Sequence, residues 1–306
     1  PNLFISKSKR ANGTEQDMSY LVYAIIYGCI IAVGLPLNII SLWILLRHHG
    51  RKSPSVVFMA NLVVSDLLLI LSLSMRVYFY AMERWHLGGM WCVWFTMLFR
   101  NNIRTSSIFI TFISVDRLLA VVYPLRSRLV RTSVNAVKGS VLIWAIVVLV
   151  NVPESVVFLR NFDNQTCFAN TNQTSRRNGE ILELTIGYFQ LVLLLTMLTV
   201  NIISTVMVSC TLQRHLSESA KVNNKLNVML IFAMNLMMFA VFFLPVSLVV
   251  FFDHLRPELS CLASVNCCLD PVLYYFSFDG FWKIWDKSRK YTKKPPFLYA
   301  SSSSTH

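Results

Sequence analysis

Residues 55–80 read SVVFMANLVVSDLLLILSLSMRVYFY, an apolar run with one acidic residue, Asp66, and one basic residue, Arg76. A helix needs about 20 predominantly apolar residues to cross the hydrocarbon core of a bilayer, and this run is long enough. Six further runs of this kind occur in the chain, at 20–46, 92–122, 136–158, 182–212, 226–252 and 259–277. We therefore predict an all-α fold, a seven-transmembrane helix bundle.

The composition of the whole chain agrees with a membrane protein. Of the 306 residues, 55% are hydrophobic and 14% are charged, and the mean hydropathy is +0.55. A soluble domain has about 25% charged residues, so the composition argues against a soluble enzyme and excludes a disordered or collagen-like protein. The net charge of +13 raises the question of a nucleic-acid partner. Because the basic residues lie between the apolar runs, we expect membrane lipids and no nucleic acid as partners.

The distribution of basic residues predicts which ends of the helices face the cytoplasm. Lys and Arg are concentrated after the first, third, fifth and seventh runs, and cytoplasmic loops carry such an excess. Three N-x-Thr glycosylation sequons fall on the predicted outer side, at Asn12, Asn164 and Asn172. Glycosylation requires lumenal exposure, so the sequons support the same orientation. We expect a multi-pass protein of the plasma membrane with an extracellular N-terminus.

The chain divides into three parts on this basis. Residues 1–19 form an extracellular N-terminal segment, residues 20–277 the helix bundle, and residues 278–306 the cytoplasmic tail. The tail starts with aromatic residues between 278 and 285 and continues with Lys and Arg. This pattern is typical of a short amphipathic helix that lies on the inner leaflet after the seventh span.

The interval between Pro245 and Pro271 is short for the end of the sixth helix, a loop and the start of the seventh. It measures 26 residues, and each helical residue advances only about 1.5 Å. Either the last helix pair is truncated on its outer side, or a segment is missing from the sequence between the two prolines.

Two of the seven cysteines are candidates for a disulfide bond. The other five lie inside or at the edge of apolar runs: Cys29, Cys210, Cys261, Cys267 and Cys268. Cys92 and Cys167 both fall on the predicted outer side, where an oxidising environment allows a disulfide to persist. We predict that these two cysteines are bonded.

Short motifs follow one another in order along the spans. They include Pro36-Leu37-Asn38, Asn61 to Leu68, Asp116-Arg117 with Pro124-Leu125, Trp144, Phe242-Phe243-Leu244-Pro245 and Asp270-Pro271-x-x-Tyr274. Together they resemble the rhodopsin-like (class A) G-protein-coupled receptors over nearly the whole chain. Phe58-Met59-x-Asn61-Leu62 and the Asp270 motif resemble the branch of nucleotide and lysophospholipid receptors. The resemblance implies a receptor that binds an extracellular ligand and activates a heterotrimeric G protein.

Asp66 is a candidate functional residue because it lies in the middle of an apolar run. An ionised side chain there costs several kcal/mol. The resemblance implies a sodium ion at this position, and hard oxygen ligands suit such a cation. The polar residues expected around Asp66 are Asn38, Asn102, Ser106, Asn266 and Asp270. The alternative is a dry hydrogen-bond network between the helices.

The resemblance also implies roles in activation and G-protein coupling for Asp116, Arg117, Phe243, Pro245, Pro271 and Tyr274. Arg117 would pair with Asp116 in the inactive state and be released to contact the G protein. Lys225 stands where some receptors have an acidic partner for this arginine. Thr205 stands where the family usually has Tyr, and the fifth span contains no proline. These departures leave one alternative, a non-signalling decoy or scavenging receptor.

Three arginines lie in the outer half of the predicted bundle, Arg76, Arg100 and Arg104. Arg100 and Arg104 are four residues apart and share one helix face. Buried guanidinium groups with few carboxylates nearby indicate an anionic ligand, since their planar fork suits phosphate or carboxylate. Apolar residues at 94–99 favour a lysophospholipid over a nucleotide or a carboxylate. The alternative is that the arginines pair with acids of the outer rim, among them Glu154, and with backbone carbonyls.

The sequence argues against an enzyme. It contains no C-x-x-C or H-E-x-x-H motif, and no nucleophile is identifiable near Asp66. A retinal-binding opsin needs a Lys in its last span to form a Schiff base, and residues 258–276 contain none. We therefore expect neither catalysis nor a required cofactor.

Overall fold

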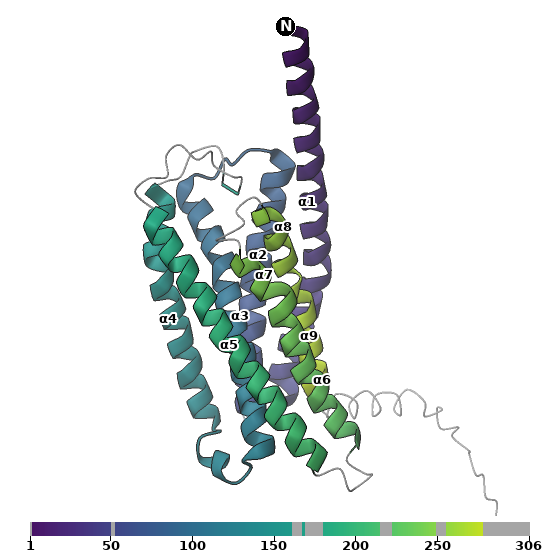
Figure 1. Cartoon of the computed structure of the whole chain (residues 1–306), viewed down its shortest axis with the longest axis vertical. Coiled ribbons are helices and arrows are strands. Elements are labelled where there is room, and N and C mark those ends of the chain that lie inside the picture. Colours follow the sequence, from purple (N-terminus) through teal and green to yellow (C-terminus); the bar gives the residue numbers. More distant parts are fainter. Residues whose placement is uncertain are drawn as a thin grey trace, which may run out of the picture.

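The fold is a bundle of helices that run side by side (Figure 1). The computed structural model describes residues 2–49, 53–160, 167–168, 180–214, 222–248 and 255–277. Within these ranges every regular element is helical and no strand occurs. The predicted all-α fold class is confirmed.

The first five predicted spans are long helices. They are α1 (Asn2–Ile44), α2 (Pro54–Met82), α3 (Gly89–Val122), α4 (Ser133–Arg160) and α5 (Glu180–Arg214). A π-helical turn, η1 (Leu45–His49), continues α1, and a 3₁₀ turn, η3 (Arg126–Leu129), connects α3 to α4. The N-terminal part of α1 projects beyond the bundle (Figure 1), because the helix continues through the polar segment that precedes the apolar run.

The sixth and seventh spans are built from shorter pieces. The sixth comprises α6 (Val222–Met238), the π-helical turn η6 (Phe239–Phe243) and α7 (Leu244–Ser247). The π turn ends two residues before Pro245, a residue that has no N–H and cannot continue a regular helical hydrogen-bond ladder. The seventh span comprises α8 (Arg256–Ser264) and α9 (Asn266–Ser277). Together α8 and α9 advance about 33 Å, enough to cross a bilayer core of about 30 Å.

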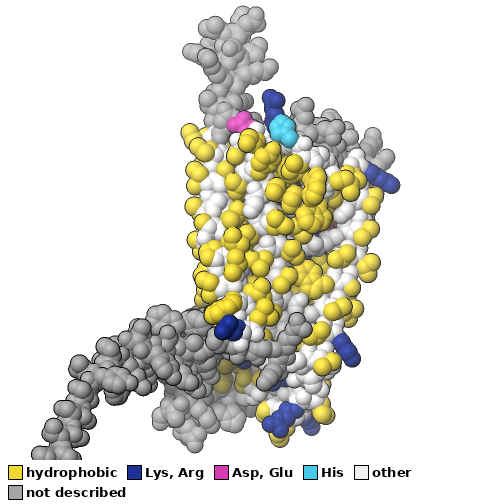
Figure 2. All heavy atoms as spheres, turned by 180° about the vertical axis from the view of Figure 1, so that it is seen from behind, with side chains coloured by type: hydrophobic (Ala, Val, Ile, Leu, Met, Phe, Trp, Pro, Cys, Tyr) yellow, Lys and Arg dark blue, Asp and Glu magenta, His cyan; other side chains and the backbone are white. Residues whose placement is uncertain are grey.

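The surface of the bundle fits a lipid environment. Among the described residues, six helical stretches are long and apolar enough to cross a membrane: Met18–Arg47, Pro54–Met82, Gly89–Val122, Ser133–Arg160, Leu184–Gln213 and Val228–Ser247. Apolar side chains cover the flank of the bundle, and the coloured charged side chains lie toward its two ends (Figure 2). A flank of this kind is stable only against hydrocarbon, so the chain is a multi-pass membrane protein.

The core lies along α2 and α3. Leu62, Leu69 and Leu73 of α2 are at most 1% exposed, and Phe109 of α3 is fully buried. Phe243 in η6 is fully buried as well and lies edge-to-face against Phe239, with ring centroids 5.4 Å apart. Phe243, for which the resemblance implies a role in activation, is thus part of the core.

Residues of the sequence motifs hold neighbouring helices together. Trp144 Nε1 of α4 donates to Asn61 Oδ1 of α2 over 3.0 Å. Asn38 Nδ2 of α1 donates to the carbonyl of Cys267 in α9 over 2.8 Å. Gly34 makes this approach of α1 to α9 feasible, because a Cβ at this position would lie 3.1 Å from the Cys267 sulfur.

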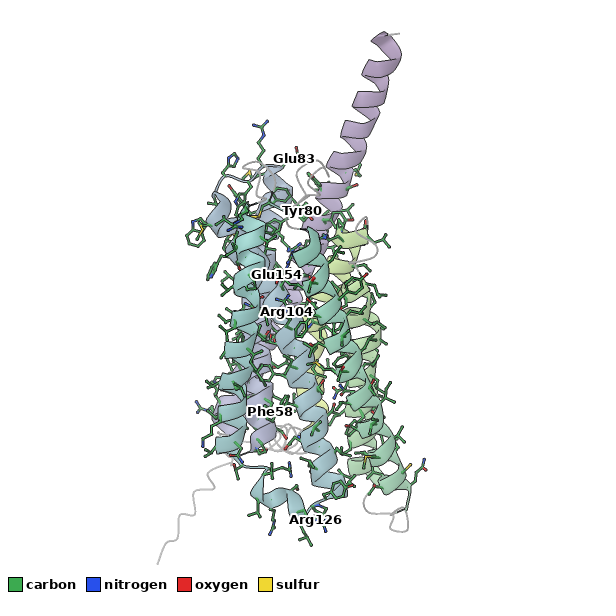
Figure 3. All side chains as sticks on the ribbon, turned by 60° about the vertical axis from the view of Figure 1, so that its left-hand side comes forward. Phe58, Tyr80, Glu83, Arg104, Arg126 and Glu154 are labelled. Atoms are coloured by element: carbon green, nitrogen blue, oxygen red, sulfur yellow. A yellow bond between two sulfur atoms is a disulfide. The ribbon has the colours of Figure 1, made fainter. Side chains whose placement is uncertain are left out.

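The predicted disulfide is present, and it defines one end of the bundle. Cys92, near the start of α3, is bonded to Cys167, which lies 75 residues later in the chain. We call this end the disulfide end, and the opposite end, where η3 lies, the Arg126 end (Figure 3).

Several predictions concern residues outside the described part of the chain. The amphipathic helix after the seventh span and the sequons at Asn164 and Asn172 lie there. Asn12 and Tyr274 lie in α1 and α9, but their side chains are outside the described set.

Candidate functional site

A polar cluster joins α3, α4 and α5 in the half of the bundle nearer the disulfide end. Arg100 Nη1 donates to Glu154 Oε1, and Arg104 Nη2 donates to Glu154 Oε2 over 2.8 Å. Arg104 also donates to Asn151 Oδ1 and, over 3.2 Å, to Gln190 Oε1. Figure 3 shows the Arg104 and Glu154 positions within the bundle. We call these five residues the arginine cluster.

Helical spacing explains why these side chains meet. Arg100 and Arg104 are one turn apart on α3, as predicted, and Asn151 and Glu154 are three residues apart on α4, so each pair shares one face. Arg104 and Glu154 are only 5% and 7% exposed, whereas the Arg100 side chain is 26% exposed. The alternative of pairing with Glu154 is thus realised for both arginines. One carboxylate serves two guanidinium groups, and the three ionised groups carry one net positive charge.

Arg76 is held differently, by aromatic rings. Its guanidinium carbon lies 4.3 Å from the ring centroid of Phe99, 4.8 Å from that of Phe168 and 5.9 Å from that of Tyr27. Such contacts stabilise a cation by about 0.5–2 kcal/mol each. Phe168 follows the disulfide-bonded Cys167, so the disulfide fixes the residue that covers Arg76.

The Arg76 charge is buried, and no acid among the described residues neutralises it. The residue is 7% exposed, and no carboxylate of the described residues lies within 4.0 Å of its guanidinium group. Its Nε also has no hydrogen-bond partner in the described part of the chain. Phe99, which Arg76 contacts, precedes Arg100 on α3, so Arg76 and the arginine cluster lie at one level of the bundle.

A second polar group surrounds Asp66 in the middle of the bundle. Asn102 Nδ2 donates to Asp66 Oδ1 over 3.0 Å and to the hydroxyls of Ser65 and Ser106 over 3.1 Å each. All four residues are at most 2% exposed. The predicted grouping of Asp66, Asn102 and Ser106 is therefore present.

The seventh span adds acceptor atoms to this central group. Asp270 lies close enough to Asp66 for the two carboxyl groups to interact electrostatically. Three of their four carboxylate oxygens, Asp66 Oδ2 and both of Asp270, have no N–H or hydroxyl donor among the described residues, and the two carboxyl groups can bond to each other only when one of them is protonated. Both polar side-chain atoms of Asn266 likewise have no partner within the described ranges. Asn38 donates to backbone carbonyls instead. Buried oxygens of this kind fit a hard monovalent cation.

Asp116 at the Arg126 end has partners outside its motif. Arg131 donates to both carboxylate oxygens, from Nε over 2.7 Å and from Nη2 over 3.0 Å. Ser55 at the start of α2 donates to Asp116 Oδ2 as well. Arg117, the predicted contact residue for the G protein, has its Nε buried. The carboxylate therefore ties α3 both to α2 and to the segment before α4.

Two hydroxyls of α3 tie this helix to α5 and α6. Asn201 Nδ2 of α5 donates to Thr111 Oγ1 over 3.0 Å, and Asn235 Nδ2 of α6 donates to Ser114 Oγ over 2.6 Å. All four side chains are buried. The fifth span is one continuous helix, and Thr205 in it donates to the Asn201 carbonyl.

Sequence inspection did not assign a role to five of these residues, Arg131, Asn151, Gln190, Asn201 and Asn235. The last four of these are polar residues within apolar runs. A polar residue in a membrane span is a candidate for function or for helix packing, so they could have been identified from the sequence. Arg131 carried no such signal, since it stands among several arginines of a predicted loop.

Comparison with known proteins gives a consistent result. Residues 37–274 match the family described as "7 transmembrane receptor (rhodopsin family)". Lysophosphatidic acid receptor 6 of Gallus gallus is 28% identical over 288 residues, which cover 87% of this chain and 93% of that protein. Lysophosphatidic acid receptor 4 of Homo sapiens is 29% identical over 296 residues, covering 89% and 80%. Lysophosphatidic acid receptor 5 of Mus musculus is 32% identical over 288 residues, covering 86% and 76%.

Proposed function

The chain belongs to the rhodopsin family of seven-transmembrane receptors, and we propose that it binds an extracellular lysophospholipid with an anionic headgroup and activates a heterotrimeric G protein. The observation that carries this proposal is Arg76, a buried guanidinium group among aromatic rings with no described carboxylate beside it. An unpaired buried charge is costly, and an anion relieves that cost. The names of the relatives support a lysophospholipid over a nucleotide or a carboxylate.

The arginine cluster completes the proposed headgroup site. Arg100 is the more exposed of its two arginines and reaches Glu154 through Nη1, so its outer nitrogens suit a phosphate best. Arg104 is more buried and also bonds Asn151 and Gln190, and we assign it mainly an electrostatic role. A planar guanidinium group gives bidentate, charge-assisted hydrogen bonds to phosphate oxygens.

Direct binding tests the proposal. In receptor purified in nanodiscs, Arg76→Gln should weaken binding of a labelled lysophosphatidic acid by about 10- to 100-fold, since charge-assisted hydrogen bonds contribute about 1.5–3 kcal/mol. Arg84→Gln is the matched control, because Arg84 is an exposed arginine just beyond α2. Equal affinity in wild type and Arg76→Gln would contradict the proposed site.

The same proposal sets the orientation in the membrane. The disulfide end would face the outside of the plasma membrane, with the N-terminus and the sequons at Asn12, Asn164 and Asn172. The Arg126 end, with Asp116, Arg117 and the Pro124-Leu125 loop, would face the G protein. The relatives are named as receptors for a ligand, which favours signalling over a decoy or scavenging role. Agonist-dependent nucleotide exchange on purified G protein distinguishes the two.

We also propose that the central polar group binds a sodium ion. Asp66, Ser106 and Asp270 would supply hard oxygen ligands, with Asn102 orienting Asp66 and Asn266 adding an amide oxygen. The support is the set of buried carboxylate oxygens that have no N–H or hydroxyl donor among the described residues. Bound there, the cation would offset one of the two negative charges that both carboxylates would carry if ionised in this low-dielectric environment.

A further inference from the structure

Glu154 is the acidic member of the arginine cluster, and it uses both of its oxygens on arginines. Oε1 accepts from Arg100 and Oε2 accepts from Arg104. A phosphate offers the same kind of acceptor to a guanidinium group. The carboxylate therefore acts on the two arginines as an internal counter-anion.

We propose that Glu154 is a specificity-determining residue that sets how strongly the receptor distinguishes ligand headgroups by charge. The proposal rests on the proposed binding of an anionic headgroup beside Arg76 and Arg100. With Glu154 ionised, Arg100 and Arg104 present one net positive charge to the headgroup. Without it they present two.

The location of Glu154 makes this effect large. Its side chain is only 9% exposed, so water screens its charge weakly and its influence extends to a ligand held by Arg100. The two residues that hold it in place, Arg100 and Arg104, lie one turn apart on the neighbouring helix α3. A charge fixed in this way acts on every bound anion.

Coulomb's law gives the proposal a distinctive signature. The repulsion between Glu154 and a headgroup is proportional to the charge of the headgroup. Removing the Glu154 charge must therefore change the binding free energy of a dianion by twice as much as that of a monoanion. The fold increase in affinity for the dianion is then the square of the fold increase for the monoanion. A change that acts through packing alone would affect both headgroups alike.

Two probes with one acyl chain measure this signature. One is an acylglycerol phosphate, a phosphomonoester that carries about −1.5 to −2 charges near neutral pH. The other is its methyl ester, a phosphodiester with a single negative charge. Competition binding in nanodiscs gives the affinity of each for wild type, Glu154→Gln and Glu83→Gln. Glu83 is an exposed carboxylate at the end of α2 and is the matched control for a charge change that solvent screens.

We expect Glu154→Gln to strengthen binding of the phosphodiester by about 10-fold and of the phosphomonoester by about 30- to 100-fold. The preference for the monoester then rises about 3- to 10-fold, while Glu83→Gln changes either affinity by less than about 2-fold. Arg100→Gln moves the preference in the opposite direction. If Glu154→Gln alone does not fold, Arg104→Gln is compared with the double variant Arg104→Gln/Glu154→Gln, in which the preference should rise by the same factor.

Three results would overturn the proposal. They are unchanged affinities in Glu154→Gln, equal changes for the two probes, and weaker binding of both at an unaltered melting temperature. Failure of the proposed function is a separate outcome, because wild-type receptor would then bind neither probe.

Discussion

The hydrogen bond from Asn235 of α6 to Ser114 of α3 should restrain the receptor in its inactive conformation. The bond is buried and measures 2.6 Å. Arg117 lies one turn beyond Ser114 on α3, and its Nε is buried. We expect that contact of a G protein with Arg117 requires α6 to move away from α3, a movement that would break the Asn235 bond.

The magnitude follows from measured interhelical hydrogen bonds in membranes, which average about 0.6 kcal/mol and reach about 1.7 kcal/mol. Loss of such a restraint shifts a two-state equilibrium by about 3- to 18-fold toward the open state. Asn235→Leu should therefore raise agonist-independent nucleotide exchange on purified G protein by that factor. Ser114→Ala should raise it by a similar factor, and the double variant should add little to either single change.

The control for this experiment is Thr199→Ala on α5, whose hydroxyl is exposed and bonds only within its own helix. Basal exchange in this variant should match wild type. If Asn235→Leu leaves basal exchange unchanged while full agonist still activates, α6 is not held by this bond and the reasoning is wrong.

Three further outcomes are expected. Arg131→Gln should lower the melting temperature by about 2–6 °C, because it leaves the buried Asp116 carboxylate without its bidentate partner. The double variant Arg131→Gln/Asp116→Asn should be no less stable than Arg131→Gln alone. Replacing a bulky monovalent cation with sodium at constant ionic strength should weaken agonist binding, and Asp66→Asn should abolish this effect. If the agonist affinity of wild type is the same in both salts, the proposed sodium site is refuted. Replacing Cys92 and Cys167 with Ala should cost about 3–4 kcal/mol of stability in thermal or denaturant unfolding, and it should reduce agonist potency because Phe168 loses its anchor over Arg76. If the variant without the disulfide keeps the agonist potency of wild type at matched expression, the proposed anchoring of Phe168 over Arg76 is wrong.

The fold could be predicted from the sequence because a bilayer leaves few choices. A segment that crosses lipid must satisfy its backbone hydrogen bonds internally, so a long apolar run becomes a helix. The limits of the helices were less predictable. α1 begins at Asn2, well before its apolar run, because no proline between Asn2 and Leu35 interrupts the helix. The seventh span begins at Arg256 rather than at 259, which gives it the length to cross a membrane.

The candidate site was predicted in part. The one-turn spacing of Arg100 and Arg104 follows from the helix repeat alone. Their shared partner Glu154 was expected at the rim of the bundle, and its burial between them depends on how α3 and α4 are rotated about their axes. Apolar residues surround most of each membrane helix, so the hydrophobic pattern does not determine that rotation. The contact of Arg131 with Asp116 depends on the loop through η3, which the pattern does not determine either.

Lysophospholipid-stimulated nucleotide exchange tests the central claim most directly. Purified receptor in nanodiscs is titrated with a lysophosphatidic acid in the presence of G protein, for wild type, Arg76→Gln and the Arg84→Gln control. The claim that Arg76 holds an anionic headgroup predicts lipid-dependent exchange in wild type and in the control, with a midpoint about 10- to 100-fold higher in Arg76→Gln. Absence of lipid-dependent exchange in wild type, or an unchanged midpoint in Arg76→Gln, would contradict it.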